Sequence, residues 1–164
     1  METSQSVEPV AVVVDTMVYG AGLTRRTEPL AMRYARHLVG RRLVLSFQTV
    51  AELRHGALHA GWGERKRAEL ERRLARATVV GADDALTTAY AELRHACIQA
   101  GHALGAKEHA ADRWVAFTAI HHGLPLVSDD GDFVDCPGLT LIREPADPTA
   151  FTPSQAADEG DADG

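Results

Sequence analysis

Cysteine is scarce in this sequence of 164 residues, and no cysteine motif is present. Cys97 and Cys136 are the only two, and neither belongs to a Cys-x-x-Cys pair. Two cysteines cannot build the disulfide framework of a small secreted domain. We therefore expect both to be reduced thiols.

Long apolar runs are also missing. No stretch approaches the roughly 20 apolar residues that span a bilayer. The N-terminal residues METSQSVEP have neither the basic start nor the apolar stretch of a signal peptide. Hydrophobic residues make up 45% of the chain, which is ordinary for a globular protein. We therefore expect a single-domain cytoplasmic protein.

Several common catalytic signatures are absent. The sequence contains no P-loop, no G-x-G-x-x-G, no G-x-S-x-G elbow and no H-E-x-x-H motif. DTMVY lacks the second Asp of an aspartyl-phosphate phosphatase. His55 and His59 lie four residues apart, on one helix side with Glu52, as zinc ligands would, but no third ligand has an obvious spacing. This leaves zinc as a weak alternative.

The net charge of −6 conceals an uneven distribution. Residues 25–76 hold thirteen of the 17 Lys and Arg residues and five acids, which gives 13 − 5 = +8. Residues 144–164 hold six acids and no Lys or Arg. The average charge argues against nucleic acid as a partner, but the basic segment does not. Solvated helix faces are the alternative explanation of that segment.

Short apolar segments alternate with helical ones. The pattern predicts strands at 10–14, 43–45, 78–80, 126–128 and 139–142, and helices at 27–39, 47–60, 64–76, 84–101 and 107–121. Ser46 and either Asp83 or Asp84 are expected N-caps. This alternation predicts an α/β fold with a mostly parallel sheet flanked by helices. Ligands of such sheets bind at the carboxyl ends of the strands.

The two ends of the chain differ from the middle in composition. We expect a flexible N-terminal extension at 1–9, a folded domain at 10–143 and a disordered acidic tail at 144–164.

Four acidic residues lie where such a sheet would gather them. Asp15 directly follows the first expected strand, and Asp130 follows the fourth. Glu52 and Asp112 lie near the starts of two expected helices. Singly, each acid suits a cap, a turn or a solvent-facing position. Together, four carboxylates need a compensating cation, and hard divalent ions such as Mg²⁺ or Mn²⁺ supply it.

Three segments, taken in order, resemble PIN domains and more narrowly the VapC toxins of bacterial toxin–antitoxin pairs. They are VVVDTMVY, SFQTVAELRHGAL and ADRWVAFTAIHHGLPLVSDDGDF, within residues 10–143. Each motif is short, but the ordered set is specific. The resemblance implies a PIN-like fold of four to five short strands, Mg²⁺-dependent ribonuclease activity, a homodimer and a VapB-type antitoxin partner.

The resemblance also implies which residues act. It assigns catalysis and metal binding to Asp15, Glu52, Asp112 and Asp130. AELRH occurs twice, but only Glu52 has a matching strand before it and a small residue, Gly56, one turn later; Glu92 is mid-helix. Secondary candidates are Ser128, Asp132 and Thr16, with Ser128 in place of the family's usual threonine. Candidates for RNA binding are Arg25, Arg26, Arg65, Lys66, Arg67 and Arg113, the last with a structural ion pair as its alternative.

Two departures from the family pattern stand out. Gly131 replaces a residue that is often basic, and the N-terminal extension and acidic tail are additional. The alternatives to a ribonuclease are a catalytically silent PIN-like module that binds RNA or protein, and a metal-dependent phosphatase or DNA nuclease on a similar fold. The complete acid set argues against the silent module.

Overall fold

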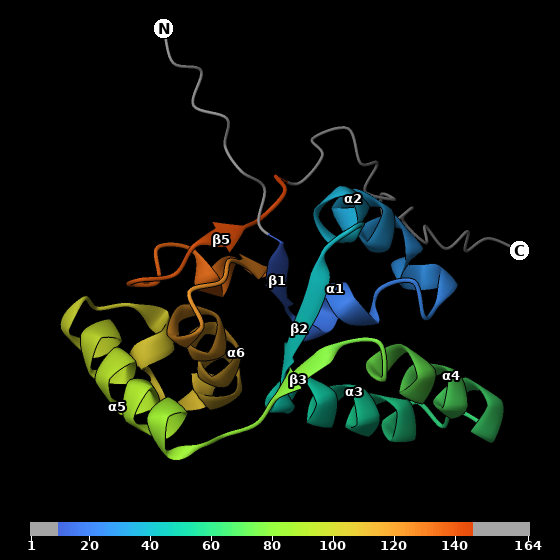
Figure 1. The fold of residues 1–164 in the computed structure, drawn as a ribbon, viewed down its shortest axis with the longest axis horizontal. Coiled ribbons are helices and arrows are strands. Elements are labelled where there is room, and N and C mark those ends of the chain that lie inside the picture. The colour runs from blue at the N-terminus through green and yellow to red at the C-terminus, as the bar shows by residue number, and fades with distance from the viewer. Residues whose placement is uncertain (1–9, 146–164) are drawn as a thin grey trace, which may run out of the picture.

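A computed structural model describes residues 10–145. The expected flexible extension at 1–9 and residues 146–164 of the expected tail lie outside the described residues. Five parallel strands form one sheet in the order β3-β2-β1-β4-β5 (Figure 1). This confirms the expected α/β fold.

The elements have the following bounds. The strands are β1 (Ala11–Val14), β2 (Arg42–Ser46), β3 (Thr78–Val80), β4 (Leu126–Val127) and β5 (Leu141–Ile142). The α-helices are α1 (Thr16–Gly20), α2 (Glu28–Leu38), α3 (Phe47–His59), α4 (Glu64–Leu74), α5 (Asp84–Gln99) and α6 (Ala110–His121). The 3-10 helices are η1 (Arg25–Thr27), η2 (Ala103–Gly105), η3 (Lys107–His109) and η4 (Gly131–Phe133).

Helix α1 is the main element that the apolar pattern does not predict. It has five residues, too few for an apolar stripe to repeat. The expected helix at 107–121 also divides into η3 and α6. The remaining expected elements are present, with ends shifted by a few residues.

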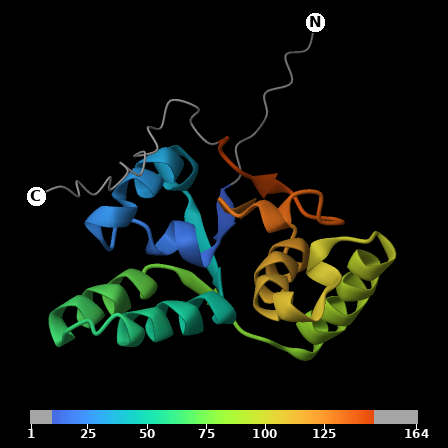
Figure 2. The ribbon, with the colours of Figure 1, turned by 180° about the vertical axis from the view of Figure 1, so that it is seen from behind.

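Strand β1 is the centre of the sheet and is buried on both faces. Val12 and Val14 join an apolar cluster with α1, α2 and α4, whereas Ala11 and Val13 join a cluster with α5 and α6. The two ribbon views show these two groups of helices on opposite sides of the sheet (Figures 1 and 2). Because each buried valine stabilises the fold by about 1.5–3 kcal/mol, this strand anchors both layers.

Side-chain caps determine where two long helices begin. The Ser46 hydroxyl accepts a hydrogen bond from the Gln48 N–H (3.3 Å) and starts α3 directly after β2. The Asp83 carboxylate accepts one from the Leu86 N–H (2.7 Å) and starts α5. Both predicted caps are confirmed, with Asp83 rather than Asp84 at the cap. The Ser46 cap places the first turns of α3 at the carboxyl edge of the sheet.

Glu144, which the sequence assigns to the tail, is attached to α2. Its backbone N–H donates to the Tyr34 hydroxyl (3.0 Å), and its carboxylate contacts Arg36 and His37. The described part of the chain therefore includes two residues, Glu144 and Pro145, past the expected domain end. Within residues 10–145, no helix is both long and apolar enough to cross a membrane.

Candidate active site

Asp15 lies at the carboxyl edge of the sheet, directly after the central strand. It is the N-cap of α1, and its Oδ1 accepts a hydrogen bond from the Thr16 N–H (2.7 Å). Its Oδ2 accepts one from the Ser128 hydroxyl (2.8 Å). Only 8% of Asp15 is exposed to solvent. Asp15 therefore does cap a helix, which was the alternative to a functional role. The cap uses Oδ1, whereas Oδ2 faces Ser128 after β4.

The environment of Asp15 disfavours its charged form. Burial raises its pKa from 3.8 to about 6, and the two hydrogen bonds only partly oppose this. The negative charges of Asp112 and Glu52 raise the pKa further. The charges of these two acids therefore act on Asp15, but Asp15, Glu52 and Asp112 do not form one of the groups within residues 10–145 whose ligand atoms all lie within 4.8 Å of one another. A cation there would relieve their mutual repulsion.

Glu52 lies on α3 and faces the same edge. Its Oε2 accepts a hydrogen bond from the Thr16 hydroxyl (2.5 Å), and its Oε1 accepts one from the Gln48 amide (3.3 Å). Thr16 thus connects Asp15 to Glu52 through one residue's backbone and side chain. Glu92, in the second AELRH copy, is exposed on α5. The two copies therefore have different environments, as the position of the preceding strand suggests.

Asp112 lies in the first turn of α6 beside His109, which was not a predicted site residue. The His109 Nδ1 lies 3.0 Å from one Asp112 carboxylate oxygen and 3.7 Å from one of Asp132. The hydrogen bond to Asp112 is the main cause of a raised His109 pKa. The ligand atoms of all three residues lie within 4.8 Å of one another. His109 precedes Asp112 by three residues, and that helical spacing was the available signal.

The acids after β4 have different roles. Asp130 is the N-cap of η4, and its carboxylate accepts a hydrogen bond from the Asp132 N–H (2.9 Å). Its own N–H donates to the Ser128 hydroxyl (3.1 Å). Asp129 bonds instead to Tyr34 and Arg33. The contacts therefore connect Asp132 to Asp112, while Asp130 is joined to Asp15 only through Ser128.

Arg113 corrects one expectation. Its side chain is 2% exposed, and it donates to the carbonyl oxygens of Leu104 (2.7 Å) and Ala106 and to the Tyr90 hydroxyl (2.8 Å). A guanidinium enclosed in this way cannot reach an RNA phosphate. It also has no carboxylate partner among these bonds, so the expected ion pair is replaced by bonds to backbone carbonyls.

The other basic candidates lie at the surface. Arg25 and Arg26 in η1 and Arg65 and Arg67 in α4 are exposed. The Lys66 ammonium lies 3.9 Å from the centre of the Trp62 ring. These positions are accessible to an anionic partner. The possible metal-ligand groups within residues 10–145 include neither His55 nor His59, and they do not include Asp15, Glu52 or Asp130 either.

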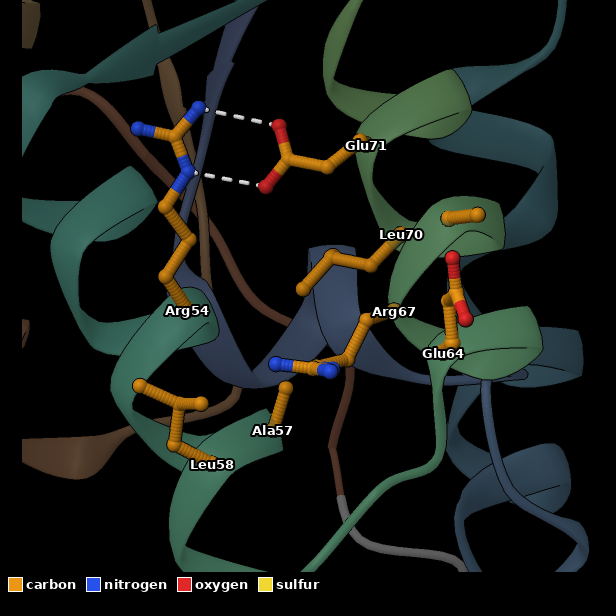
Figure 3. Close-up of a pocket in the computed structure, with 8 residues that line it drawn as sticks. Arg54, Ala57, Leu58, Glu64, Arg67, Leu70 and Glu71 are labelled. Atoms are coloured by element: carbon orange, nitrogen blue, oxygen red, sulfur yellow. Dashed lines mark hydrogen bonds and ion pairs between the residues drawn. The ribbon is translucent and has the colours of Figure 1, made fainter.

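A hollow of about 380 Å³ separates α3 from α4 (Figure 3). Its apolar lining includes Ala57, Leu58 and Leu70. The Arg54 guanidinium and the Glu71 carboxylate form a two-bond ion pair at its margin, with both N–O distances 2.9 Å. A second hollow of about 260 Å³ shares Ala57 and reaches residues of the acidic site. It is lined by Thr16, Gly20, Leu23, Thr24, Thr27, Glu52, Leu53, Gly56, Ala57 and Trp62.

Comparison with known proteins identifies the family. The sequence model of the PIN domain matches residues 12–139. The chain therefore belongs to the PIN domain family. None of the curated proteins searched matches the sequence.

Solved structures agree with this family. VapBC-5 from Mycobacterium tuberculosis is 27% identical, with a TM-score of 0.55 over 83% of this chain and 100% of that chain. VapBC2 from Rickettsia felis, bound to promoter DNA, has a TM-score of 0.67 at 21% identity over 81% of this chain and 98% of that chain. FitAcB from Neisseria gonorrhoeae has a TM-score of 0.65 at 24% identity over 80% and 96%. The resemblance to VapC-type PIN toxins is therefore confirmed.

Proposed function

We propose that this chain is the toxin of a toxin–antitoxin pair and acts as a Mg²⁺-dependent endoribonuclease. The observation that carries the proposal is a PIN fold in which Thr16 joins the buried Asp15 to Glu52 at the carboxyl edge of the sheet. The similarity to VapBC structures supports the toxin role. The cytoplasm, where RNA and the antitoxin are made, is the expected location.

The donors at this site fit a hard divalent cation. All of them are carboxylate oxygens, and their shared negative charge already raises the pKa of Asp15. Asp15, Glu52 and Asp112 would hold the ion, with Asp132 or Asp130 as the fourth acid. Asp132 has the closer connection, because it shares His109 with Asp112. Mn²⁺ is expected to replace Mg²⁺.

The chemistry follows from the arrangement of these side chains. If these acids held Mg²⁺, the ion would supply a Lewis acid for the scissile phosphate and for an attacking water. Ser128 and the Thr16 N–H orient Asp15, and the Thr16 hydroxyl orients Glu52. In-line attack by water leaves a 5′-phosphate and a 3′-hydroxyl. The exposed bases Arg25, Arg26, Arg65 and Arg67, together with Lys66, would attract the RNA backbone and make binding dependent on salt.

The proposed partner is a VapB-type antitoxin. The structures named above are of VapBC and FitAcB, and a toxic nuclease needs an inhibitor made with it. The hollow of Figure 3 offers apolar surface to such a segment. The adjoining hollow leads from Ala57 to Glu52. An antitoxin Arg or Lys could then pair with the acids. We also propose that two copies of this chain form a homodimer, as the resemblance to VapC toxins implies.

One assay separates this function from its alternatives. Purified chain is incubated with RNA, DNA or a phosphomonoester, with and without Mg²⁺. We expect cleavage of RNA alone, only with Mg²⁺, and its loss in Asp112→Asn but not in the exposed control Glu92→Gln. RNA binding without cleavage would indicate the silent module. Turnover of only DNA or the phosphomonoester would indicate the other enzymes.

A further inference from the structure

A second group of metal-ligating side chains lies apart from the carboxylates. Cys97 is near the end of α5, His102 caps η2, and Cys136 follows η4. Their ligand atoms, two sulfurs and one ring nitrogen, lie within 4.8 Å of one another. We propose that this thiol–imidazole cluster (Cys97, His102 and Cys136) binds one Zn²⁺ ion. The proposal is independent of the nuclease assignment.

The chemistry of the cluster selects the metal. Two sulfurs and an imidazole suit Zn²⁺, whereas Mg²⁺ takes oxygen ligands. Cys97 is fully buried and Cys136 is 5% exposed, both within the apolar cluster beside α5 and α6. Zn²⁺ would displace one proton from each thiol. The two thiolate charges then balance the ion, so that no net charge is buried in the apolar core.

The empty cluster is stable as neutral thiols. Burial raises the pKa of Cys136 to about 12, and the neighbouring Cys97 contributes to the shift. Such thiols are poor nucleophiles and behave as small apolar side chains. Metal binding therefore competes with protons, and the affinity for Zn²⁺ should rise with pH.

His102 is already oriented by the backbone. Its Nδ1 accepts a hydrogen bond from the Leu104 N–H (3.1 Å), and its Nε2 lies 2.8 Å from the Val134 carbonyl oxygen, to which it donates. This is the neutral imidazole that binds metals. Coordination through Nδ1 gives up the bond from Leu104 and keeps the Nε2–H bond to Val134. The bond that remains is the kind that usually orients a ligating histidine.

A metal here would join two segments that are distant in sequence. Cys97 and His102 belong to the end of α5 and the start of η2, and Cys136 follows the η4 segment that contains Asp132. Helices η2 and η4 also contact each other. Zn²⁺ would thus hold the loop of Asp130 and Asp132 against the helical layer. Residues 10–145 supply three ligands to this cluster, which leaves the fourth tetrahedral position to water.

The test uses the full chain, reduced and stripped of metal, with Co²⁺ and Zn²⁺ as probes. We expect one equivalent of Co²⁺ to produce the absorption of tetrahedral cobalt with a sulfur-to-cobalt charge-transfer band, and one equivalent of Zn²⁺ to abolish it. Excess Mg²⁺ should leave the cobalt absorption unchanged. Zn²⁺ should also protect both thiols from alkylation and raise the Tm by about 5–10 °C.

Variants assign the signal to the cluster. Cys136→Ser and Cys97→Ser should lose the charge-transfer band, and His102→Gln should weaken Zn²⁺ binding by about 100-fold. Asp112→Asn, at the carboxylate site, should bind Zn²⁺ as the wild type does. Because a cysteine variant can fail to fold, the wild-type spectrum is decisive by itself. Absence of the band in the wild type, its persistence in Cys136→Ser, or a Cys97–Cys136 disulfide that resists reduction and excludes metal would overturn the proposal.

Discussion

Ser128 donates a 2.8 Å hydrogen bond to the buried carboxylate of Asp15, although 113 positions separate them in the chain. The contact exists because β1 and β4 are parallel neighbours, and the Asp15 N–H donates to the Val127 carbonyl oxygen (3.0 Å). Ser128 is fully buried and also accepts the Asp130 N–H. The Ser128 hydroxyl thus connects Asp15, which follows β1, to Asp130, which lies after β4.

Removal of that hydroxyl should weaken both fold and activity. Ser128→Ala leaves the buried Asp15 oxygen without its donor, which we expect to cost about 1–3 kcal/mol in the free energy of unfolding. Ser128→Thr keeps a hydroxyl and serves as the matched control. Urea unfolding measures the cost, and RNA cleavage measures the loss of orientation. Equal stability of Ser128→Ala and wild type would contradict this role.

Asp15 should make stability depend on pH. Its pKa of about 6 in the folded chain exceeds the 3.8 of an ordinary Asp. The folded state therefore binds the Asp15 proton more tightly than the unfolded state does. The resulting contribution to the free energy of unfolding is complete below pH 4 and is lost as the pH rises through 6. The shift corresponds to about 3 kcal/mol.

Asp15→Asn isolates this effect. Without divalent ions, the variant should gain stability relative to wild type as pH rises from 4 to 7, by about 2–3 kcal/mol, while losing RNA cleavage. Mg²⁺ should stabilise the wild type more than the variant. Unfolding curves at several pH values, with and without Mg²⁺, provide the measurement; a constant difference across pH would refute the prediction.

The two AELRH copies allow a matched comparison. Glu52→Gln should reduce kcat for RNA cleavage by at least about 100-fold, because it removes a charge from the proposed metal site. Glu92→Gln should stay within about twofold of wild type, since an exposed position contributes little. Circular dichroism checks that both variants fold. Similar losses in the two variants would mean that Glu52 acts only structurally.

Arg113 should matter for stability rather than for RNA binding. Arg113→Met leaves the buried Leu104 carbonyl oxygen without its donor and also removes a bond to Ala106, and we expect a loss of about 3 kcal/mol. Arg67→Gln, on exposed α4, should instead leave stability unchanged and weaken RNA binding mainly at low salt. Thermal unfolding and a salt series of RNA affinities measure the two effects. An unaltered Tm in Arg113→Met would contradict the structural role.

Competition between Mg²⁺ and the antitoxin tests the inhibitory model. If an antitoxin cation pairs with the acids, calorimetry should show weaker antitoxin binding in high Mg²⁺ and a smaller Mg²⁺ effect in Asp15→Asn. Leu58→Glu, in the hollow of Figure 3, should weaken binding by about tenfold or more, because it buries a charge in an apolar contact. Ile98→Glu, an exposed apolar position on α5, is the control. Affinity indifferent to Mg²⁺ would place the inhibitor away from the acids.

Local patterns predicted much of the fold because their physical causes are local. The β-branched run before Asp15 identifies the doubly buried central strand, and a side-chain oxygen beside an N-terminal turn identifies the caps at Ser46 and Asp83. The positions after these strands also suggested which acids to consider. The apolar pattern did not predict helix α1, which a cap at Asp15 only suggested as an alternative, because short helices lack a period. The burial of Arg113 was not predicted, since guanidinium groups are usually exposed.

By itself, the sequence determined the alternation of strands and helices, a first strand buried on both faces and the acids available to a metal site. Only the tertiary structure decided how those acids are connected: Thr16 joins Asp15 to Glu52, and His109 joins Asp112 to Asp132. It also brought Cys97 and His102 to Cys136. The physical reason is range. Hydrophobic period and capping act within a few residues, whereas pKa shifts and ligand geometry depend on distances between segments that only the packed sheet and helices bring together.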